Sequence, residues 1–165
     1  MTAIFRSNSI FDSTPPLGEG SETRQEKIQR CKLELKMAGM TKYGFTKFNS
    51  RYLPKIIHDD EHIMGVIYGR YPEGPGVLSW TDRMVVATDR RVISLNHKPG
   101  YTDVDEFTYD VIDGVESLRA GFYTAVRINT KIDVLFVRMV NPRCAERFVH
   151  YIEKRRIEYY EGTRG

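Results

Sequence analysis

The 165-residue sequence contains two cysteines, Cys31 and Cys144, and neither has a CxxC spacing or a histidine cluster beside it. Both fall at apolar positions of expected helices, so we expect buried, reduced thiols rather than a disulfide or a metal site. Apolar runs are short beside the roughly 20 residues that cross a bilayer. The first residues also lack the basic flank and continuous apolar segment of a secretory signal, so we expect a cytoplasmic protein.

Motifs of catalysis and nucleotide binding are lacking as well. The sequence has no GxSxG, HExxH, P-loop or dinucleotide fingerprint. Its four histidines, at positions 58, 62, 97 and 150, stand outside any recognisable nucleophile arrangement. We therefore expect a non-enzymatic protein that uses no cofactor.

The chain has no large excess of one charge. Its formal net charge of +3 divides into +1 over 1–40, 0 over 41–140 and +2 over 141–165. A dedicated nucleic-acid binder usually has a basic stripe or a domain pI above about 9. The composition therefore argues against nucleic acid as the main partner.

Residues 1–21 are rich in Ser, Thr, Pro and Gly, a composition that predicts a flexible tail. Two apolar pairs interrupt it, Ile4-Phe5 and Ile10-Phe11. We regard them as candidate partner-binding residues that would dock into a groove, of this protein or another, or add as an edge strand. The alternative is that they are merely apolar residues of a loose tail.

An amphipathic helix is expected over 22–38, with Ser21 as its cap and Gly39 at its end. Its apolar stripe follows helical spacing, at Ile28, Cys31, Leu35 and Ala38. Residues 39–44 would form a hinge, which makes 22–45 a helix-and-hinge segment before the main domain at 46–160. The stripe would pack either on that domain or on a partner.

Short β-branched runs with turn residues between them fill most of the remaining chain. The clearest pair joins 85–88 to 92–95 through the Asp89-Arg90 turn, as in an antiparallel hairpin. Strands are expected at 61–68, 77–80, 84–88, 91–97, 102–109, 115–120, 122–129 and 132–139, with the second and third separated or bent at 81–83. Turns about ten residues apart are typical of an antiparallel barrel or sandwich.

Asn141-Pro142 predicts the start of a terminal helix, and 161–165 would be a short tail. The apolar face of that helix comprises Ala145, Phe148, Val149, Ile152 and Tyr159. We therefore expect a mainly β (α+β) fold, in which a curled antiparallel sheet or barrel of about seven strands is capped by a C-terminal helix, with an N-terminal helix added.

Three stretches in this order resemble the bacterial PH-like domains of the YokE-like kind, over about residues 50–158. They are Asp60-Glu61-His62-Ile63, Val86-Ala87-Thr88-Asp89-Arg90-Arg91-Val92-Ile93 and Phe107-Thr108-Tyr109-Asp110-Val111-Ile112-Asp113-Gly114-Val115. The resemblance implies a pleckstrin-homology-like fold used for recognition or scaffolding without catalysis. It implies no particular ligand. The basic loop with which inositol-phosphate-binding PH domains grip their ligand is here rich in Pro and Gly, with Arg70 and Glu73.

Arg70, Tyr71 and Trp80 flank the loop between the first two expected strands. They are candidate partner-binding residues if exposed, or packing residues if not. Arg90 and Arg91 suggest an anion contact beside turn amides. The alternative is that Asp89 satisfies the turn amides and the two arginines pair with acids on neighbouring strands.

Two further clusters carry alternative interpretations. His58, Asp60 and His62 would share one face of an extended strand, as transition-metal ligands do, but they lack a fourth ligand, so we expect polar edge residues and no metal. Lys154, Arg155 and Arg156 would contact an anionic partner or lipid surface. Alternatively, they interact with the macrodipole at the end of the last helix.

Three functional hypotheses remain open. The leading one is a non-enzymatic interaction or scaffolding domain that binds a protein or peptide partner. The second is a peripheral membrane adaptor that binds anionic lipid. The third is a structural protein that forms homo-oligomers through the helix at 22–38.

Overall fold

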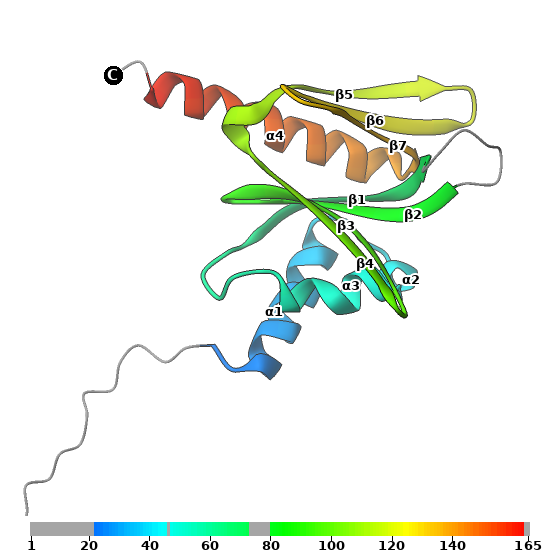
Figure 1. The fold of residues 1–165 in the computed structure, drawn as a ribbon, viewed down its shortest axis with the longest axis vertical. Coiled ribbons are helices and arrows are strands. Elements are labelled where there is room, and N and C mark those ends of the chain that lie inside the picture. Colours follow the sequence, from blue (N-terminus) through cyan, green and yellow to red (C-terminus); the bar gives the residue numbers. More distant parts are fainter. Residues whose placement is uncertain (1–21, 46, 73–79, 164–165) are drawn as a thin grey trace, which may run out of the picture.

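The computed structural model describes residues 22–45, 47–72 and 80–163. Three short helices and a 3-10 turn precede seven strands, and a long helix follows them (Figure 1). In chain order the elements are α1 (Arg24–Met37), α2 (Lys42–Phe45), α3 (Phe48–Tyr52), η1 (Leu53–Lys55), β1 (Ile63–Pro72), β2 (Trp80–Thr88), β3 (Arg91–Lys98), β4 (Tyr101–Thr108), η2 (Tyr109–Val111), β5 (Ile112–Ala120), β6 (Tyr123–Thr130), β7 (Val134–Val140) and α4 (Pro142–Gly162).

The seven strands form one antiparallel sheet in the order β4-β3-β2-β1-β7-β6-β5. Two limbs, β1–β4 and β5–β7, meet where Arg70 of β1 pairs with Arg138 of β7. Gly69 permits this junction, because a Cβ there would overlap the carbonyl oxygen of Arg138 and lie 2.8 Å from Cγ1 of Val137. The expected fold, with its terminal helix and added N-terminal helix, is confirmed.

Helix α4 lies between the two limbs, and α1–α3 cover the opposite face of the β1–β4 limb (Figure 1). Two hydrophobic cores result. Phe148 and Ile152 of α4 pack in the first, between the limbs, while Cys31 and Leu35 of α1 pack in the second, under the helices. Of the alternatives for the N-terminal helix, the structure therefore shows packing on its own domain.

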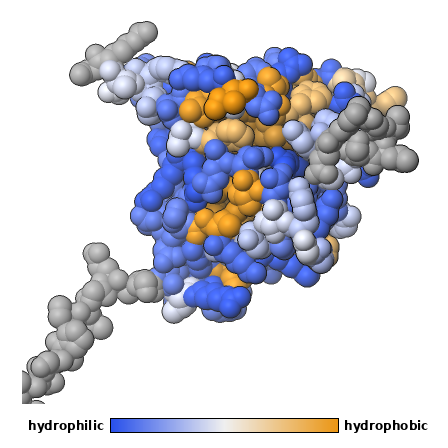
Figure 2. Space-filling model, in the orientation of Figure 1, coloured by the Kyte–Doolittle hydropathy of each residue, from blue (hydrophilic) through white to orange (hydrophobic). Residues whose placement is uncertain are grey.

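Burial on both faces explains the continuous apolar run in β2. Val85 and Ala87 point into the first core, whereas Met84 and Val86 point into the second, and all four are fully buried. A strand covered on both faces needs no alternation of polar and apolar residues. On the face that Figure 2 shows, most of the surface is hydrophilic, with hydrophobic groups over the upper limb and, in smaller number, lower down.

The turn between β2 and β3 is held differently from our prediction. Thr88, not Asp89, caps it, because the Thr88 hydroxyl accepts from the backbone N–H groups of Arg90, at 3.1 Å, and Arg91, at 3.0 Å. Asp89 instead accepts from the backbone N–H of His62, at 3.0 Å. A hydroxyl that reaches back to the turn amides is an alternative that residue types alone do not distinguish from an aspartate turn.

Several element boundaries differ from the prediction. Thr23 caps α1 through a capping box with Glu26, while Ser21 lies outside the described residues. Strand β2 runs unbroken through 81–83, β1 starts at Ile63 and continues to Pro72, and β7 starts at Val134 because 130–133 form the turn. The last helix continues to Gly162, into the expected tail.

The segment expected as a hinge is tied to α4. Gly39 ends α1 with φ at +105°, and its carbonyl accepts from Sγ of Cys144 at 3.3 Å. Arg147 of α4 donates to the carbonyl of Met37 at 3.1 Å. Both cysteines are buried and free, and burial raises the pKa of the Cys31 thiol to about 11.

Candidate functional site

Strand β5 ends the sheet, and β6 is its hydrogen-bonded neighbour among the strands that the structure describes. Ala120 and Tyr123 flank the two-residue turn that joins β5 to β6, where Gly121 has φ at +62°. Residues that flank such a turn form a hydrogen-bonded pair, and this role alternates along the strand. The backbone N–H and C=O groups of Ser117 and Arg119 therefore point away from β6.

A groove of about 440 Å³ runs between this edge and α4, which we call the β5–α4 groove. Its lining comes from β5, β6 and the first half of α4, namely Ser117, Arg119, Thr124, Pro142, Glu146, Val149, His150 and Glu153. Figure 1 shows β5 at the outer margin of its limb with α4 beneath it. An unpaired strand edge next to a groove is the arrangement to which extended peptides add as a further strand.

The groove offers both hydrogen-bonding and side-chain contacts. Arg119 and His150 contribute basic groups, Glu146 and Glu153 contribute carboxylates, and Val149 contributes an apolar, partly buried surface that packs on the first core. Such a mixed lining suits a peptide with alternating side chains better than a small uniformly charged ligand.

His58, Asp60 and His62, which we expected to be polar residues rather than metal ligands, precede β1. The Nδ1 atom of His62 contacts Oε1 of Glu34 at 2.8 Å, and Asp60 pairs with Arg90. Across the described ranges, no group of three His, Cys, Asp or Glu side chains could hold a metal ion. The extended strand that we expected to carry them does not include these residues, and β1 is an inner strand of the sheet.

Arg91 is tied into a buried ion pair beneath the β2–β3 turn. Its Nε and Nη2 atoms donate to the two carboxylate oxygens of Glu61, each at 2.9 Å, and it also pairs with Glu106. Glu61 is fully buried and accepts from the Thr88 hydroxyl at 2.8 Å and from the backbone N–H of His58 at 3.0 Å.

Burial alone raises the pKa of Glu61, but its hydrogen bonds from Arg91, His58 and Thr88 outweigh burial and hold that pKa at about 2. Arg90 pairs with the exposed Asp60. Both arginines thus pair with acids, which agrees with one part of our second alternative. Asp60 and Glu61 precede β1, however, and only Glu106 lies on a neighbouring strand.

The basic run on α4 lies inside the helix rather than at its end. Because α4 continues to Gly162 and has no basic residue in its last turn, the macrodipole interpretation is wrong. Arg155 donates to the carbonyl of Asp89 at 2.6 Å and pairs with Glu158 at 3.1 Å, and Lys154 lies 3.9 Å from Glu158. Arg156 is half-buried and makes no ion pair within the described part of the chain.

Tyr71 and Trp80 lie on neighbouring strands but face opposite sides of the sheet. Tyr71 pairs with Thr81 and packs against the first core, with the Arg83 guanidinium 4.6 Å from its ring centre. Trp80 is half-exposed, and its ring lies 5.2 Å from the guanidinium of Arg138. The two rings therefore do not form one surface.

Arg70 is exposed and has no ion pair among the residues that the structure describes. The four tail residues Ile4, Phe5, Ile10 and Phe11 lie outside the described residues. Of the predicted partner-binding residues, Arg70 is thus exposed, and Tyr71 and Trp80 each keep part of their surface exposed.

Sequence reasoning missed the β5–α4 groove residues. The strand at 115–120 and the helix after Asn141 were both predicted, but their contact depends on which strand ends the sheet. Strand order arises from pairings between distant residues, such as Arg70 with Arg138, so no local pattern in the sequence indicates it.

None of the described helices is long and apolar enough to span a membrane.

The profile of the bacterial PH domain matches residues 57–154. The match takes in β1 to β7 and the first half of α4, so it includes both walls of the β5–α4 groove, whereas α1, α2, α3 and η1 precede it. No curated protein matches the chain. Because the profile covers more than half of the sequence, the chain belongs to the bacterial PH domain family.

Proposed function

We propose that this bacterial PH domain is a non-enzymatic adaptor that binds an extended peptide segment of a partner protein in the β5–α4 groove. The observation that carries the proposal is the free edge of β5 beside α4. PH-like domains serve generally as interaction modules, which agrees with a role in recognition.

Strand β4, the other edge of the sheet, is less suited to bind a peptide. Strand β4 carries Asp103, Asp105 and Glu106, which Arg83 and Arg91 hold in ion pairs. Charged side chains on an edge strand discourage pairing with another chain. Strand β5 has fewer acids, Asp113 and Glu116, of which Glu116 pairs with Arg127 at the surface. Its groove-lining residues Ser117 and Arg119 make no ion pair with another described residue. This asymmetry supports β5 as the edge that receives the peptide.

Internal ion pairs and hydrogen bonds of the basic residues weaken the membrane alternative. Five basic residues were proposed for anion contact, and three of them, Arg90, Arg91 and Arg155, are held by carboxylates or carbonyl groups of the protein. Of the other two, Lys154 is exposed and lies 3.9 Å from Glu158, and Arg156 makes no ion pair with another described residue. Self-association through the N-terminal helix also has less support, because Cys31 and Leu35 of its apolar stripe are buried against β-strands of the same chain.

The proposal is tested with a peptide selected from a random phage-displayed library against the full chain. Titrated into the ¹⁵N-labelled protein, it should shift the amide signals of 115–120 and of α4 residues near Val149 most strongly. Signals that shift mainly around Arg70 and Trp80 would move the binding site to the junction of the limbs. Sedimentation with anionic vesicles at low salt, without peptide binding, would favour the membrane adaptor instead.

A further inference from the structure

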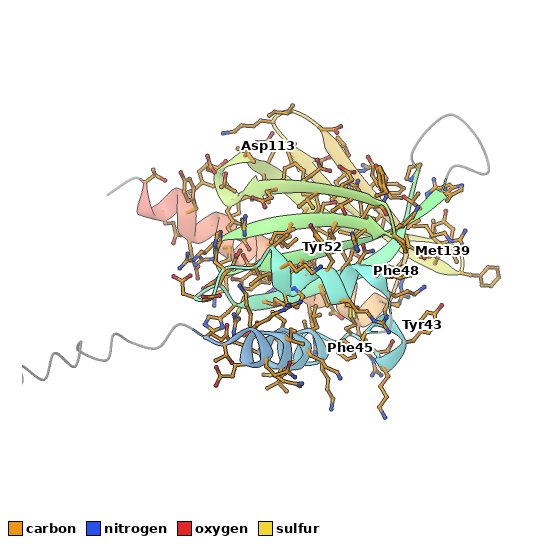
Figure 3. All side chains as sticks on the ribbon, turned by 60° about the horizontal axis from the view of Figure 1, so that its bottom comes forward. Tyr43, Phe45, Phe48, Tyr52, Asp113 and Met139 are labelled. Carbon is orange, nitrogen blue, oxygen red and sulfur yellow. The ribbon has the colours of Figure 1, made fainter. Side chains whose placement is uncertain are left out.

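A second groove lies on the other side of the molecule, in the layer of helices that precedes the family match. It runs between α1 and the segment from α2 to η1 and has a volume of about 1040 Å³. We call it the helical-layer groove. Leu35, Met40 and Phe45 provide its apolar lining, and Leu33, whose exposed fraction is 58%, lies at its rim. Figure 3 shows Phe45 of α2 beside the end of α1.

Every charged residue that lines the helical-layer groove is basic. These residues are Lys32 and Lys36 of α1, Lys42 of α2 and Arg51 of α3, and none makes an ion pair with another described residue. Four unpaired cations around an apolar lining favour an occupant with acidic and apolar faces.

Neighbouring carboxylates do not neutralise this charge. An adjoining pocket shares Arg51 with the groove and contains Glu22 and Asp59. These acids are already paired, Glu22 with Arg30 at 2.7 Å and Asp59 with Lys27 at 2.8 Å. The positive charge of the groove is therefore available to an occupant.

The walls of the groove also determine the backbone conformation of a peptide occupant. Apart from Met40 and Thr41, the lining residues belong to helices or to the 3-10 turn, and none of them lies in a strand, so no strand edge lines the groove. A bound segment must then satisfy its own backbone hydrogen bonds, which an α-helix does. A helix with an apolar stripe fills the lining, and acidic residues beside the stripe meet the four cations.

We propose that the helical-layer groove binds an acidic amphipathic helix of a partner protein. This site goes beyond the peptide binding proposed for β5, because the two grooves share no residue and the helical layer lies outside the region that defines the family. The domain is thus a two-site adaptor, with an extended segment on the sheet and a helix on the opposite layer.

The test uses two fluorescently labelled model helices with Leu at positions i, i+3, i+4 and i+7. One has Glu at its polar positions and the other has Lys, and each is titrated against the full chain. The Glu helix should bind at least about tenfold more tightly than the Lys helix, and its affinity should fall as salt rises. Equal affinities, or no binding of the Glu helix, would overturn the proposal.

Charge reversal locates the site. The double variant K32E/K36E should bind the Glu helix about tenfold more weakly, because it replaces attraction by repulsion at the rim. The matched control K98E/K131E changes the net charge equally at exposed lysines outside the groove and should retain affinity. An equal loss in both variants would show unspecific attraction and reject the site.

Two further measurements separate other occupants. Mass measurement of the full chain should give a monomer. A dimer that dissociates in K32E/K36E would instead assign the groove to a second copy of the chain. Sedimentation with phosphatidylcholine–phosphatidylglycerol vesicles should be weak. Strong vesicle binding that is lost in K32E/K36E would instead assign the groove to a membrane surface. Neither result depends on the β5–α4 groove, so a failure of either proposal is recognisable on its own.

Discussion

Glu61 shows at the scale of one residue how this domain uses its charges. Its side chain is fully buried, and Arg91 meets it with two hydrogen bonds of 2.9 Å beneath the β2–β3 turn. A buried carboxylate of this kind is stable only while its partners remain in place. The sequence predicted that the turn arginines pair with acids as one alternative, but it did not identify the acid, because Glu61 and Arg91 are 30 residues apart.

The substitution Glu61→Gln tests the buried pair. It keeps the shape of the side chain but leaves the half-buried Arg91 without its bidentate carboxylate, so the free energy of unfolding should fall by about 3 kcal/mol. Urea denaturation measures this change. The control is Glu116→Gln, which removes an exposed pair with Arg127 and should cost less than about 1 kcal/mol. Similar losses in the two variants would contradict the account of Glu61.

The pH dependence of stability follows from the lowered pKa of Glu61. Its folded pKa is about 2 against an ordinary value of 4.5, so the unfolded chain takes up the proton first as pH falls. The stabilisation is complete above pH 4.5 and is lost between that value and pH 2.

Over this range the wild-type protein should lose about 3 kcal/mol more than Glu61→Gln does. Urea unfolding of both proteins at a series of pH values measures the difference. Parallel stability curves for the two proteins would rule out this role.

At the scale of elements, periodicity predicted the helices and most strands, while burial decided their boundaries. The stripe of Ile28, Cys31, Leu35 and Ala38 predicted α1 but left its partner open between the domain and another protein. That choice depends on the outer face of β1–β3, where Met84, Val86 and Ile93 complete the second core. Because β2 is buried on both faces, its sequence lacks the polar–apolar alternation that identifies a strand with one solvated face.

Substitutions on two faces of α1 test whether this helix is part of the fold. Leu35→Ala empties a position that is 1% exposed and should lower the free energy of unfolding by about 3 kcal/mol. Leu33→Ala, on the exposed face, should change it by less than about 0.5 kcal/mol. If both variants unfold at the wild-type denaturant concentration, α1 does not contribute to the core.

At the scale of the whole molecule, strand order creates sites that no local pattern indicates. The β5–α4 groove exists because β5 ends the sheet and α4 enters between the limbs. The helical-layer groove exists because α1 and the α2–η1 segment cover the opposite face. In the sequence, the residues lining both grooves are ordinary polar and basic positions together with members of the apolar helix faces. Only contacts between distant segments bring them into one surface.

The central claim, that a peptide adds to the edge of β5, is tested most directly by removing a backbone donor from that edge. Ser117→Pro deletes an N–H group that points away from β6, so the sheet keeps its own hydrogen bonds. Thr102→Pro is the matched control on β4, the opposite edge.

The measurement is the affinity of the library-selected peptide for the wild type and for both proline variants, with their thermal unfolding checked. Ser117→Pro should bind about tenfold more weakly, because it loses one peptide hydrogen bond and its ring obstructs the edge. Thr102→Pro should bind as the wild type does. A Ser117→Pro variant that is folded and binds the peptide with unchanged affinity would contradict the account.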